Sequence, residues 1–438
     1  MIGAEGPGSP RLKGRFGANV GRLYAGQVAF SLIALAGSLL TARLLGPTGR
    51  GDLSILILLP TLFTVALEFG LESANSHLVA GKPEIRRSLQ QAATAYACLI
   101  VLPGAALTAL ALQLLDFDSG SIIKAASAGG IAIGASVYVR SMAGLALGLN
   151  RVSLYNGSRL LLALSFPIPV SILAAFGDRS AVHFFYAWCL GTAAVAIVFA
   201  LLLDACMPRL QIESIRQHVA VTLPIHLSNV SQFLLLRADQ LLLFALAGSA
   251  AVGYYAVAVN IVEVLWYLPS VAGVVSLPLL SGDGSHAEKS EMLLYALRLS
   301  IWLAALGGAL CALTAPLVVP LLFGPAFAPT VFPLEILLPG IVAGGVIRVG
   351  TAALIACGKL NHLLRVTLLA LGVNILLAVL MIPFWGAAGA AAASTVSYML
   401  LAALLLRAVT GAWSISMIAC LRCPFTLAQM RRLVSRVA

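Results

Sequence analysis

Long apolar segments follow one another along almost the whole chain, and only short polar loops separate them. A helix that crosses a bilayer needs about 20 mostly apolar residues, since each residue advances it by about 1.5 Å. The apolar segments reach this length, and the short alternating strands of a β-barrel are not found in the sequence. The pattern therefore predicts an all-α integral membrane protein. We expect about twelve spans, at residues 23–45, 52–76, 92–115, 121–148, 154–176, 182–204, 219–247, 251–280, 292–323, 331–357, 363–383 and 387–410.

The composition agrees with this pattern. Of the 438 residues, 61% are apolar and 10% are charged, and the mean hydropathy is +1.01. Soluble globular chains have about 45–50% apolar and about 25% charged residues. The net charge of +11 is spread over short loops and both termini. Because it does not form the basic face of a folded domain, we expect no nucleic-acid partner.

The basic residues fall mostly on one side of the predicted membrane. With both termini in the cytoplasm, twenty Lys and Arg lie on the cytoplasmic side, and four (Arg43, Arg50, Lys124 and Arg179) lie on the other. Lys and Arg concentrate in the cytoplasmic loops of membrane proteins. We therefore predict an even number of spans with cytoplasmic N- and C-termini.

The sequence contains none of the motifs that would support catalysis. There is no GxxxxGK[ST] phosphate loop, no nucleophile elbow and no HExxH. The single CxxC pair, Cys420 and Cys423, cannot complete a four-ligand zinc site by itself. We expect no enzymatic activity, no cofactor and no metal.

An internal repeat with an offset of 202 residues divides the chain. The segment Leu45–Gly51 corresponds to Ala247–Gly253, with the outer glycines five residues apart in both copies. Six spans separate the copies, so both halves insert the same way up. The repeat predicts two six-helix bundles related by a pseudo-two-fold axis along the membrane normal. The expected parts are a basic cytoplasmic N-terminus (1–22), two bundles (23–204 and 219–410), a cytoplasmic linker (205–218) and an amphipathic basic tail (411–438) that is either an interfacial helix or disordered.

Polar residues interrupt four of the spans at helical spacing. In the second span they form one i, i+3/i+4 stripe that includes Thr61 and Thr64. We predict that the first, second, seventh and eighth spans line a cavity between the bundles, and we add one arginine from each of two other spans. The candidate residues for substrate contact or ion coupling are Gln27, Ser31, Glu68, Glu72, Asn75, Asn229, Gln232, Arg237, Asp239, Asn260 and Glu263, together with Arg140 and Arg348.

The charged candidates should face protein or water, because a charge near the bilayer centre costs about 2.5–3.5 kcal/mol on insertion scales. Two interpretations remain open. The carboxylates could be proton or cation sites and the arginines anion anchors. Alternatively, these residues form ion pairs that lock helices together, or they extend to the interface. Arg237 and Asp239 are two residues apart, so they do not share a helix face and we expect no direct pair.

Three segments resemble a known family. They are residues 44–74 (LLGPTGRGDLSILILLPTLFTVALEFGLESA), Arg237-Ala-Asp239-Gln240 with residues 248–258, and residues 321–340. The chain resembles the polysaccharide flippases of the multidrug/oligosaccharidyl-lipid/polysaccharide exporter superfamily. The resemblance implies a V-shaped central cavity, alternating access, and transfer of undecaprenyl-pyrophosphate-linked oligosaccharide from the inner to the outer leaflet of a bacterial inner membrane. The implied use is O-antigen, capsule or exopolysaccharide biosynthesis.

The resemblance also indicates partners and leaves alternatives. The expected partners are the lipid-linked oligosaccharide and membrane lipids, with a polysaccharide polymerase and a chain-length regulator as candidates. Proton or sodium coupling is a further candidate. One alternative is a cation-coupled multidrug exporter of the same superfamily, which Glu68, Glu72 and Glu263 would favour. Another is a membrane scaffold of a glycan-assembly complex.

Overall fold

The computed structural model describes residues 10–117, 121–203, 212–281 and 285–422. Regular structure in these ranges is helical throughout, and nine helical segments in them are long and apolar enough to cross a membrane. The prediction of an all-α membrane protein is thus confirmed. The helices are α1 (Pro10–Leu67), α2 (Leu71–Gly81), η1 (Pro83–Ile85), α3 (Arg86–Leu99), α4 (Val101–Leu114), α5 (Ile122–Gly148), α6 (Val152–Leu164), α7 (Pro167–Ala175), α8 (Ala181–Leu202), α9 (Ile212–Ser281), α10 (His286–Phe323), η2 (Pro325–Thr330), α11 (Val331–Ala356), α12 (Leu360–Trp413) and α13 (Met417–Leu421).

Three of these helices, α1, α9 and α12, are each interrupted by one glycine. Gly46, Gly248 and Gly386 have φ values of 66°, 78° and 52°, and their neighbours are helical. A positive φ is open to glycine because glycine has no Cβ that would clash with the backbone. The sequence therefore allows a sharp turn inside each long apolar segment.

Hydrogen bonds and ion pairs show that the chain reverses at these glycines. Arg50 donates to Ser38 over 3.3 Å, although the two residues are 12 apart in sequence and would be about 18 Å apart in a straight helix. Asn374 likewise reaches Ser394 across Gly386 over 3.2 Å. A third such contact, between the two halves of α9, is described with the site. Each interrupted helix is thus a hairpin of two spans, and the nine segments found in the described ranges correspond to the predicted twelve spans.

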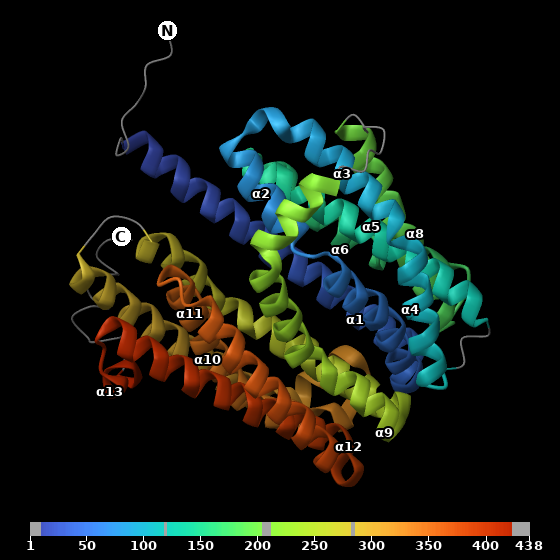
Figure 1. Cartoon of the computed structure of the whole chain (residues 1–438). Helices are drawn as coiled ribbons and strands as arrows, with labels where there is room; N and C mark the ends of the chain where they lie inside the picture. Colours follow the sequence, from blue (N-terminus) through green and yellow to red (C-terminus); the bar gives the residue numbers. More distant parts are fainter. Residues whose placement is uncertain (1–9, 118–120, 204–211, 282–284, 423–438) are drawn as a thin grey trace. The chain divides into compact units, whose positions relative to one another are not determined.

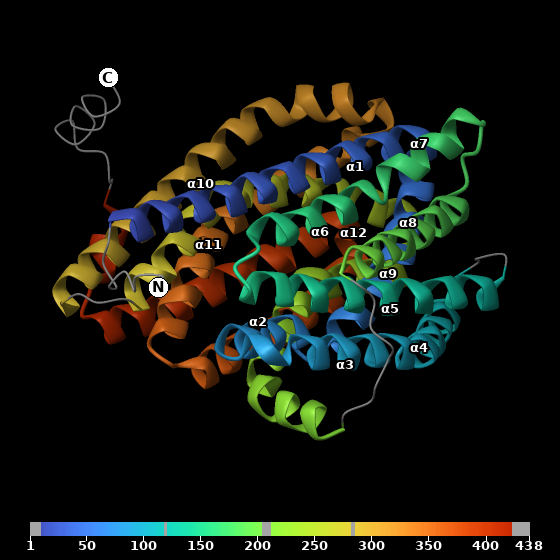
Figure 2. The same cartoon turned by 90° about the horizontal axis from the view of Figure 1, so that it is seen from above.

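The two units of the chain, Met1–Val230 and Ser231–Ala438, are each compact. In the first unit α5 is central and packs against α2, α3, α4 and α8, and Figure 2 shows it running beside α2, α3 and α4. Small residues allow this approach, since a Cβ at Gly144 of α5 would collide with the backbone carbonyl of Glu72. In the second unit α11 packs against both α10 and α12 (Figure 1).

Gly46 and Gly248 have nearly the same backbone conformation, with ψ values of −176° and 179°. They are the two residues that the 202-residue repeat aligns. The repeat therefore identifies the same turn in each half of the chain.

The predicted terminal segments and linker lie partly outside the described residues. These are the N-terminus (1–22), the linker (205–218) and the tail (411–438), and their roles remain predictions. Where the structure does describe them, α1 already begins at Pro10, α12 continues to Trp413, and α13 follows.

The second span is not the continuous helix that its hydropathy predicts. α1 ends at Leu67, Phe69 and Gly70 take positive φ values of 47° and 70°, and α2 begins at Leu71. The Tyr96 hydroxyl donates to the Leu67 carbonyl over 2.6 Å and so satisfies one group that the break leaves without a helical partner. The break lies directly beside Glu68, and it decides how the acidic residues of this span are used.

Candidate functional site

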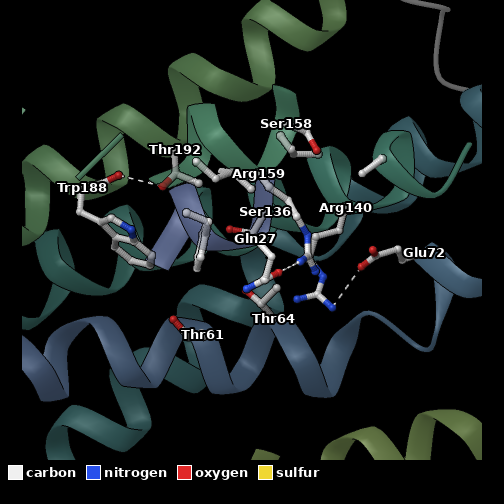
Figure 3. A pocket seen from close by; sticks show the side chains of 14 residues that line it. Gln27, Thr61, Thr64, Glu72, Ser136, Arg140, Ser158, Arg159, Trp188 and Thr192 are labelled. Atoms are coloured by element: carbon white, nitrogen blue, oxygen red, sulfur yellow. Dashed lines mark hydrogen bonds and ion pairs between the residues drawn. The ribbon is translucent and has the colours of Figure 1, made fainter. Parts of the chain in front are cut away.

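A cavity of about 360 Å³ lies inside the first unit, and Figure 3 shows its lining side chains. Its walls come from five helices: α1, α2, α5, α6 and α8. Aliphatic and aromatic groups alternate with hydroxyls and with three charged side chains. The lining residues are Gln27, Phe30, Thr61, Thr64, Glu72, Ser136, Val139, Arg140, Ala143, Ser158, Arg159, Leu162, Trp188 and Thr192.

Arg140 of α5 is held between two carboxylates. Its Nε lies 2.8 Å from Glu68 Oε2, and its Nη2 lies 3.3 Å from Glu72 Oε2. The Glu68 side chain is 6% exposed and that of Glu72 is 22% exposed, whereas that of Arg140 is 40% exposed. The guanidinium thus joins a buried acid to the cavity, where Glu72 also lies (Figure 3).

The helix break gives Glu68 a second role. Its Oε1 accepts a hydrogen bond of 3.3 Å from the backbone N–H of Glu72, in the first turn of α2. A carboxylate at this position is favourable because the first N–H groups of a helix have no helical acceptors. Glu68 therefore stabilises the start of α2 and neutralises Arg140 at the same time.

Arg159 of α6 is a second cation in the cavity. Its Nη1 donates to Gln27 Oε1 over 2.5 Å, and its guanidinium lies 5.1 Å from the Tyr155 ring centroid. In the part of the chain that the structure describes, no carboxylate pairs with it. Arg159 thus brings a positive charge that only a neutral amide and an aromatic ring contact.

The sequence interpretation missed Arg159, because it counted this residue with a cytoplasmic loop. The signal was present in the spacing of Tyr155, Ser158 and Arg159, which fall at i, i+3 and i+4 once the helix begins at Val152. The same i, i+4 spacing joins Ser136 to Arg140 in α5.

In α8, Trp188 and Thr192 have that spacing too. Because the prediction concentrated on the first two spans of this bundle, it overlooked the contributions of α6 and α8.

The second unit holds its charges differently. Arg237 Nη2 lies 2.5 Å from Glu263 Oε1, across the turn at Gly248. The two residues are 26 apart in sequence, so this ion pair ties the two halves of α9 together. Arg237 does not pair directly with Asp239, as expected from their spacing.

Asp239 is fully buried and surrounded by hydrogen-bond donors. Ser394 Oγ donates to its Oδ2 over 2.6 Å, the Tyr255 hydroxyl donates to the same oxygen, and the Gln240 N–H reaches Oδ1 over 2.7 Å. Asn374 Nδ2 donates in turn to Ser394 Oγ, while the buried Asn374 Oδ1 has no hydrogen-bond partner. The cluster therefore presents oxygen atoms from three helical segments in one buried place.

The remaining candidates are placed apart from these two clusters. Ser31 is buried and its hydroxyl donates to the Gln27 carbonyl over 2.8 Å, and buried Asn75 donates to the Ser141 carbonyl over 3.3 Å. Gln232 and Asn260 are half-buried, and Asn229 and Arg348 are exposed.

The structure thus brings Gln27, Glu68, Glu72 and Arg140 together in the first unit. In the second it brings Arg237 to Glu263 and leaves Asp239 in a separate cluster.

The predicted cavity between the bundles remains a prediction. The cavity described above lies within one unit and draws on the fourth, fifth and sixth spans as well as the first two. In the described ranges no group of three or more His, Cys, Asp or Glu side chains could hold a metal ion. The polar groups of the cavity can bind an anion at the arginines and hydroxylated groups at the threonines.

The comparisons with known proteins agree with this architecture. The profile of the family described as "Polysaccharide biosynthesis protein" matches residues 40–332, which is more than half of the chain. A comparison with curated proteins gives no match.

Solved structures of transporters share the fold. The lipid II flippase MurJ in an inward closed conformation has a TM-score of 0.75 at 13% identity, over 91% of this chain and 89% of that one. An inward-facing multidrug resistance MATE family transporter of the MOP superfamily has a TM-score of 0.66 at 16% identity, over 90% and 94% of the two chains. A MOP superfamily transporter from Pyrococcus furiosus has a TM-score of 0.56 at 15% identity, over 90% and 95%. At these identities the likeness shows a common fold.

Proposed function

Since the chain belongs to the family of polysaccharide biosynthesis proteins, we propose that it is a flippase for undecaprenyl-pyrophosphate-linked oligosaccharides. It moves repeat units from the inner to the outer leaflet of the bacterial inner membrane by alternating access, with both termini in the cytoplasm. The product feeds O-antigen, capsule or exopolysaccharide assembly, and a polysaccharide polymerase and a chain-length regulator are proposed partners.

The observation that supports this proposal most directly is the charge of the cavity. Arg159 lines it without a carboxylate partner in the described part of the chain, and Arg140 exposes part of its guanidinium to the same space. Arginine binds phosphate oxygens through parallel charge-assisted hydrogen bonds. A pyrophosphate would replace Gln27 as the acceptor for Arg159, so the interaction would change from neutral to charged.

The contacts of the acidic residues argue against the multidrug exporter. That alternative needs carboxylates that can receive a cation, and it was motivated by Glu68, Glu72 and Glu263. All three lie within 3.3 Å of an arginine nitrogen. An organic cation would have to displace a guanidinium at each of them, so these sites favour an anionic substrate.

The buried Asp239 cluster is the coupling site in this proposal. A carboxylate without a cation in contact is costly inside a protein, and Asn374 Oδ1 adds a second oxygen without a donor. A sodium ion would be bound by such oxygens, and a proton would neutralise the carboxylate directly. Either cation would link the state of α9 to that of α12.

The test is transport of a defined substrate by the full chain in proteoliposomes. An undecaprenyl-pyrophosphoryl oligosaccharide with a fluorescent sugar should become accessible to a quencher on the opposite leaflet. Arg159→Gln should lower the rate about tenfold or more, because a charge-assisted bond to phosphate contributes about 1.5–3 kcal/mol. Arg159→Lys should retain part of the activity, and Arg151→Gln, which changes an exposed arginine at the start of α6, should transport at the wild-type rate.

In cells, deletion of the gene should leave lipid-linked repeat units on the cytoplasmic side of the membrane. Normal surface polysaccharide in a clean deletion strain would contradict the proposal. So would equal transport by the wild-type protein and Arg159→Gln.

A further inference from the structure

The hydroxyl groups of the cavity have already used their protons. Thr61 donates to the Ile57 carbonyl over 2.7 Å, and Thr64 donates to the Pro60 carbonyl over 2.8 Å. Thr192 donates to the carbonyl of Trp188 over 2.9 Å. A threonine hydroxyl has one proton and two lone pairs, so each of these groups can only accept a hydrogen bond from a ligand.

The arginines of the cavity have the opposite capacity. A guanidinium has five N–H donors and no acceptor. Phosphate oxygens, which only accept, therefore match Arg140 and Arg159 and do not match the threonines. Groups that bring O–H donors match the threonines. The polar lining thus asks for a ligand with acceptors in one part and hydroxyl donors in another.

An aromatic ring marks the second part. Trp188 is half-buried and lines the cavity, and Figure 3 shows it with Thr192 on one side, while Arg140 and Glu72 lie on the other. The face of an indole ring carries partial negative charge, so it attracts polarised C–H groups. A pyranose presents such C–H groups on one face and hydroxyl groups around its rim.

We propose that the cavity recognises the first sugar of the lipid-linked chain: this pyranose stacks on Trp188 and donates hydrogen bonds to Thr61 and Thr192, while the adjoining pyrophosphate binds Arg159 and Arg140. This inference rests on the proposed function and adds the part of the substrate that is read. The volume supports it, because about 360 Å³ is near the lower end of ligand pockets, which run from about 300 to 1,000 Å³. There is room for the head of the substrate, and the more distant sugars lie outside this cavity. Trp188 is then a specificity residue for the first sugar.

The test compares two probes that differ only in that sugar. Undecaprenyl pyrophosphate and undecaprenyl-pyrophosphoryl-N-acetylglucosamine are titrated against the full chain in lipid nanodiscs. The wild-type protein should bind the sugar-bearing probe about tenfold more tightly, which corresponds to one stacked ring with its hydrogen bonds. Trp188→Leu should remove this preference and leave the affinity for undecaprenyl pyrophosphate within about twofold, since the arginines remain.

Two further variants separate stacking from folding. Trp188→Phe keeps an aromatic face and should retain most of the preference. Trp302→Leu removes an exposed tryptophan of α10 in the second unit and should bind both probes as the wild-type protein does. The tryptophan fluorescence that Trp188→Phe loses should be the part that changes when the sugar-bearing probe binds.

The outcomes distinguish this inference from the proposed function. If the wild-type protein binds both probes and Trp188→Leu keeps the preference for the sugar, the inference is wrong and the flippase proposal stands. Equal weakening of both probes by Trp188→Leu would also overturn the inference, because it would indicate a general loss of structure. If the wild-type protein binds neither probe, the proposed function fails and the inference fails with it.

Discussion

The hairpins that turn at Gly46 and Gly248 share a glycine conformation, but the helices that follow them differ. In the first unit residues 68–70 read Glu-Phe-Gly and the helix breaks, whereas the corresponding residues 270–272 read Ser-Val-Ala and α9 continues through them to Ser281. Glycine adopts a positive φ at little cost, while a β-branched valine does not. One glycine therefore distinguishes two segments that the repeat makes equivalent.

The difference extends to the buried charges. In the first unit the break exposes backbone groups, and Glu68 is used both to cap α2 and to neutralise Arg140. Arg140 shares its charge between two acids and remains partly exposed in the cavity. In the second unit Arg237 pairs with the single acid Glu263, and Asp239 is enclosed by hydroxyl and N–H donors. The comparison indicates that the first unit is built to bind an anion and the second to hold a small cation.

The largest effect is expected from removing Arg140. Arg140→Gln leaves Glu68 and Glu72 close together without a cation, and breaking a buried ion pair costs about 3–5 kcal/mol, less where a partner is exposed, as here. We expect both a lower melting temperature and loss of transport. Arg237→Gln leaves one carboxylate unpaired and should lower the melting temperature less.

The double variant Glu68→Gln/Arg140→Gln is the control for this prediction, because it removes one of the unpaired charges. It should recover part of the melting temperature without recovering transport. Equal destabilisation by Arg140→Gln and Arg237→Gln, measured by thermal unfolding in detergent, would contradict the difference between the units.

The second effect concerns Asp239 and coupling. Asp239→Asn keeps the size of the side chain but removes the charge that a sodium ion or proton would neutralise. The rate of transport should no longer depend on a sodium or proton gradient imposed on proteoliposomes. Glu263→Gln removes an acid of the same unit outside the cluster and should keep the gradient dependence. A gradient response retained by Asp239→Asn would remove the coupling role from this residue.

The third effect tests the helix break. Gly70 has a φ of 70°, so Gly70→Ala places a Cβ in a left-handed conformation at a cost of about 1–2 kcal/mol. The melting temperature should fall, and transport should fall with it, because the position of Glu68 depends on the break. Gly157→Ala is the matched control within the same unit. Its Cβ would meet no atom within 4 Å inside α6, and it should stabilise the protein by about 0.5–1 kcal/mol.

The smallest effect is expected from an exposed ion pair, which serves as the reference for the buried ones. Asp178 Oδ2 lies 2.6 Å from His183 Nδ1 in the loop between α7 and α8. Slight burial acts to raise the pKa of Asp178, but the Ser180 N–H and the His183 ring outweigh it and hold this pKa below its ordinary value. A lowered folded-state pKa gives stability that is present above the unfolded-state pKa and is lost as the pH falls through the folded-state pKa.

Thermal unfolding of Asp178→Asn should therefore differ from wild type slightly near neutral pH and not at acid pH below the folded-state pKa of Asp178. A difference that grows on acidification would contradict this sign.

Much of the fold could be predicted from the sequence because it depends on local properties. The apolar segments set the spans, and the glycines at 46 and 248 set two of the turns. The offset of 202 residues aligned them correctly. The acids and arginines inside the spans were also identified as groups that need protein or water around them, and Glu68, Glu72, Arg140, Arg237 and Glu263 all have such partners.

The sequence by itself thus determined that this is a helical membrane protein with two related halves and buried charges, because hydropathy and glycine positions act within one turn or one span. Only the tertiary structure decided which charge meets which. Arg159 and Gln27 are 132 residues apart, and Ser394 and Asp239 are 155 apart. No periodicity along one helix reports such a distance. The break after Glu68 depends in the same way on a distant hydroxyl, that of Tyr96, which accepts the cost of an open carbonyl by hydrogen bonding to it.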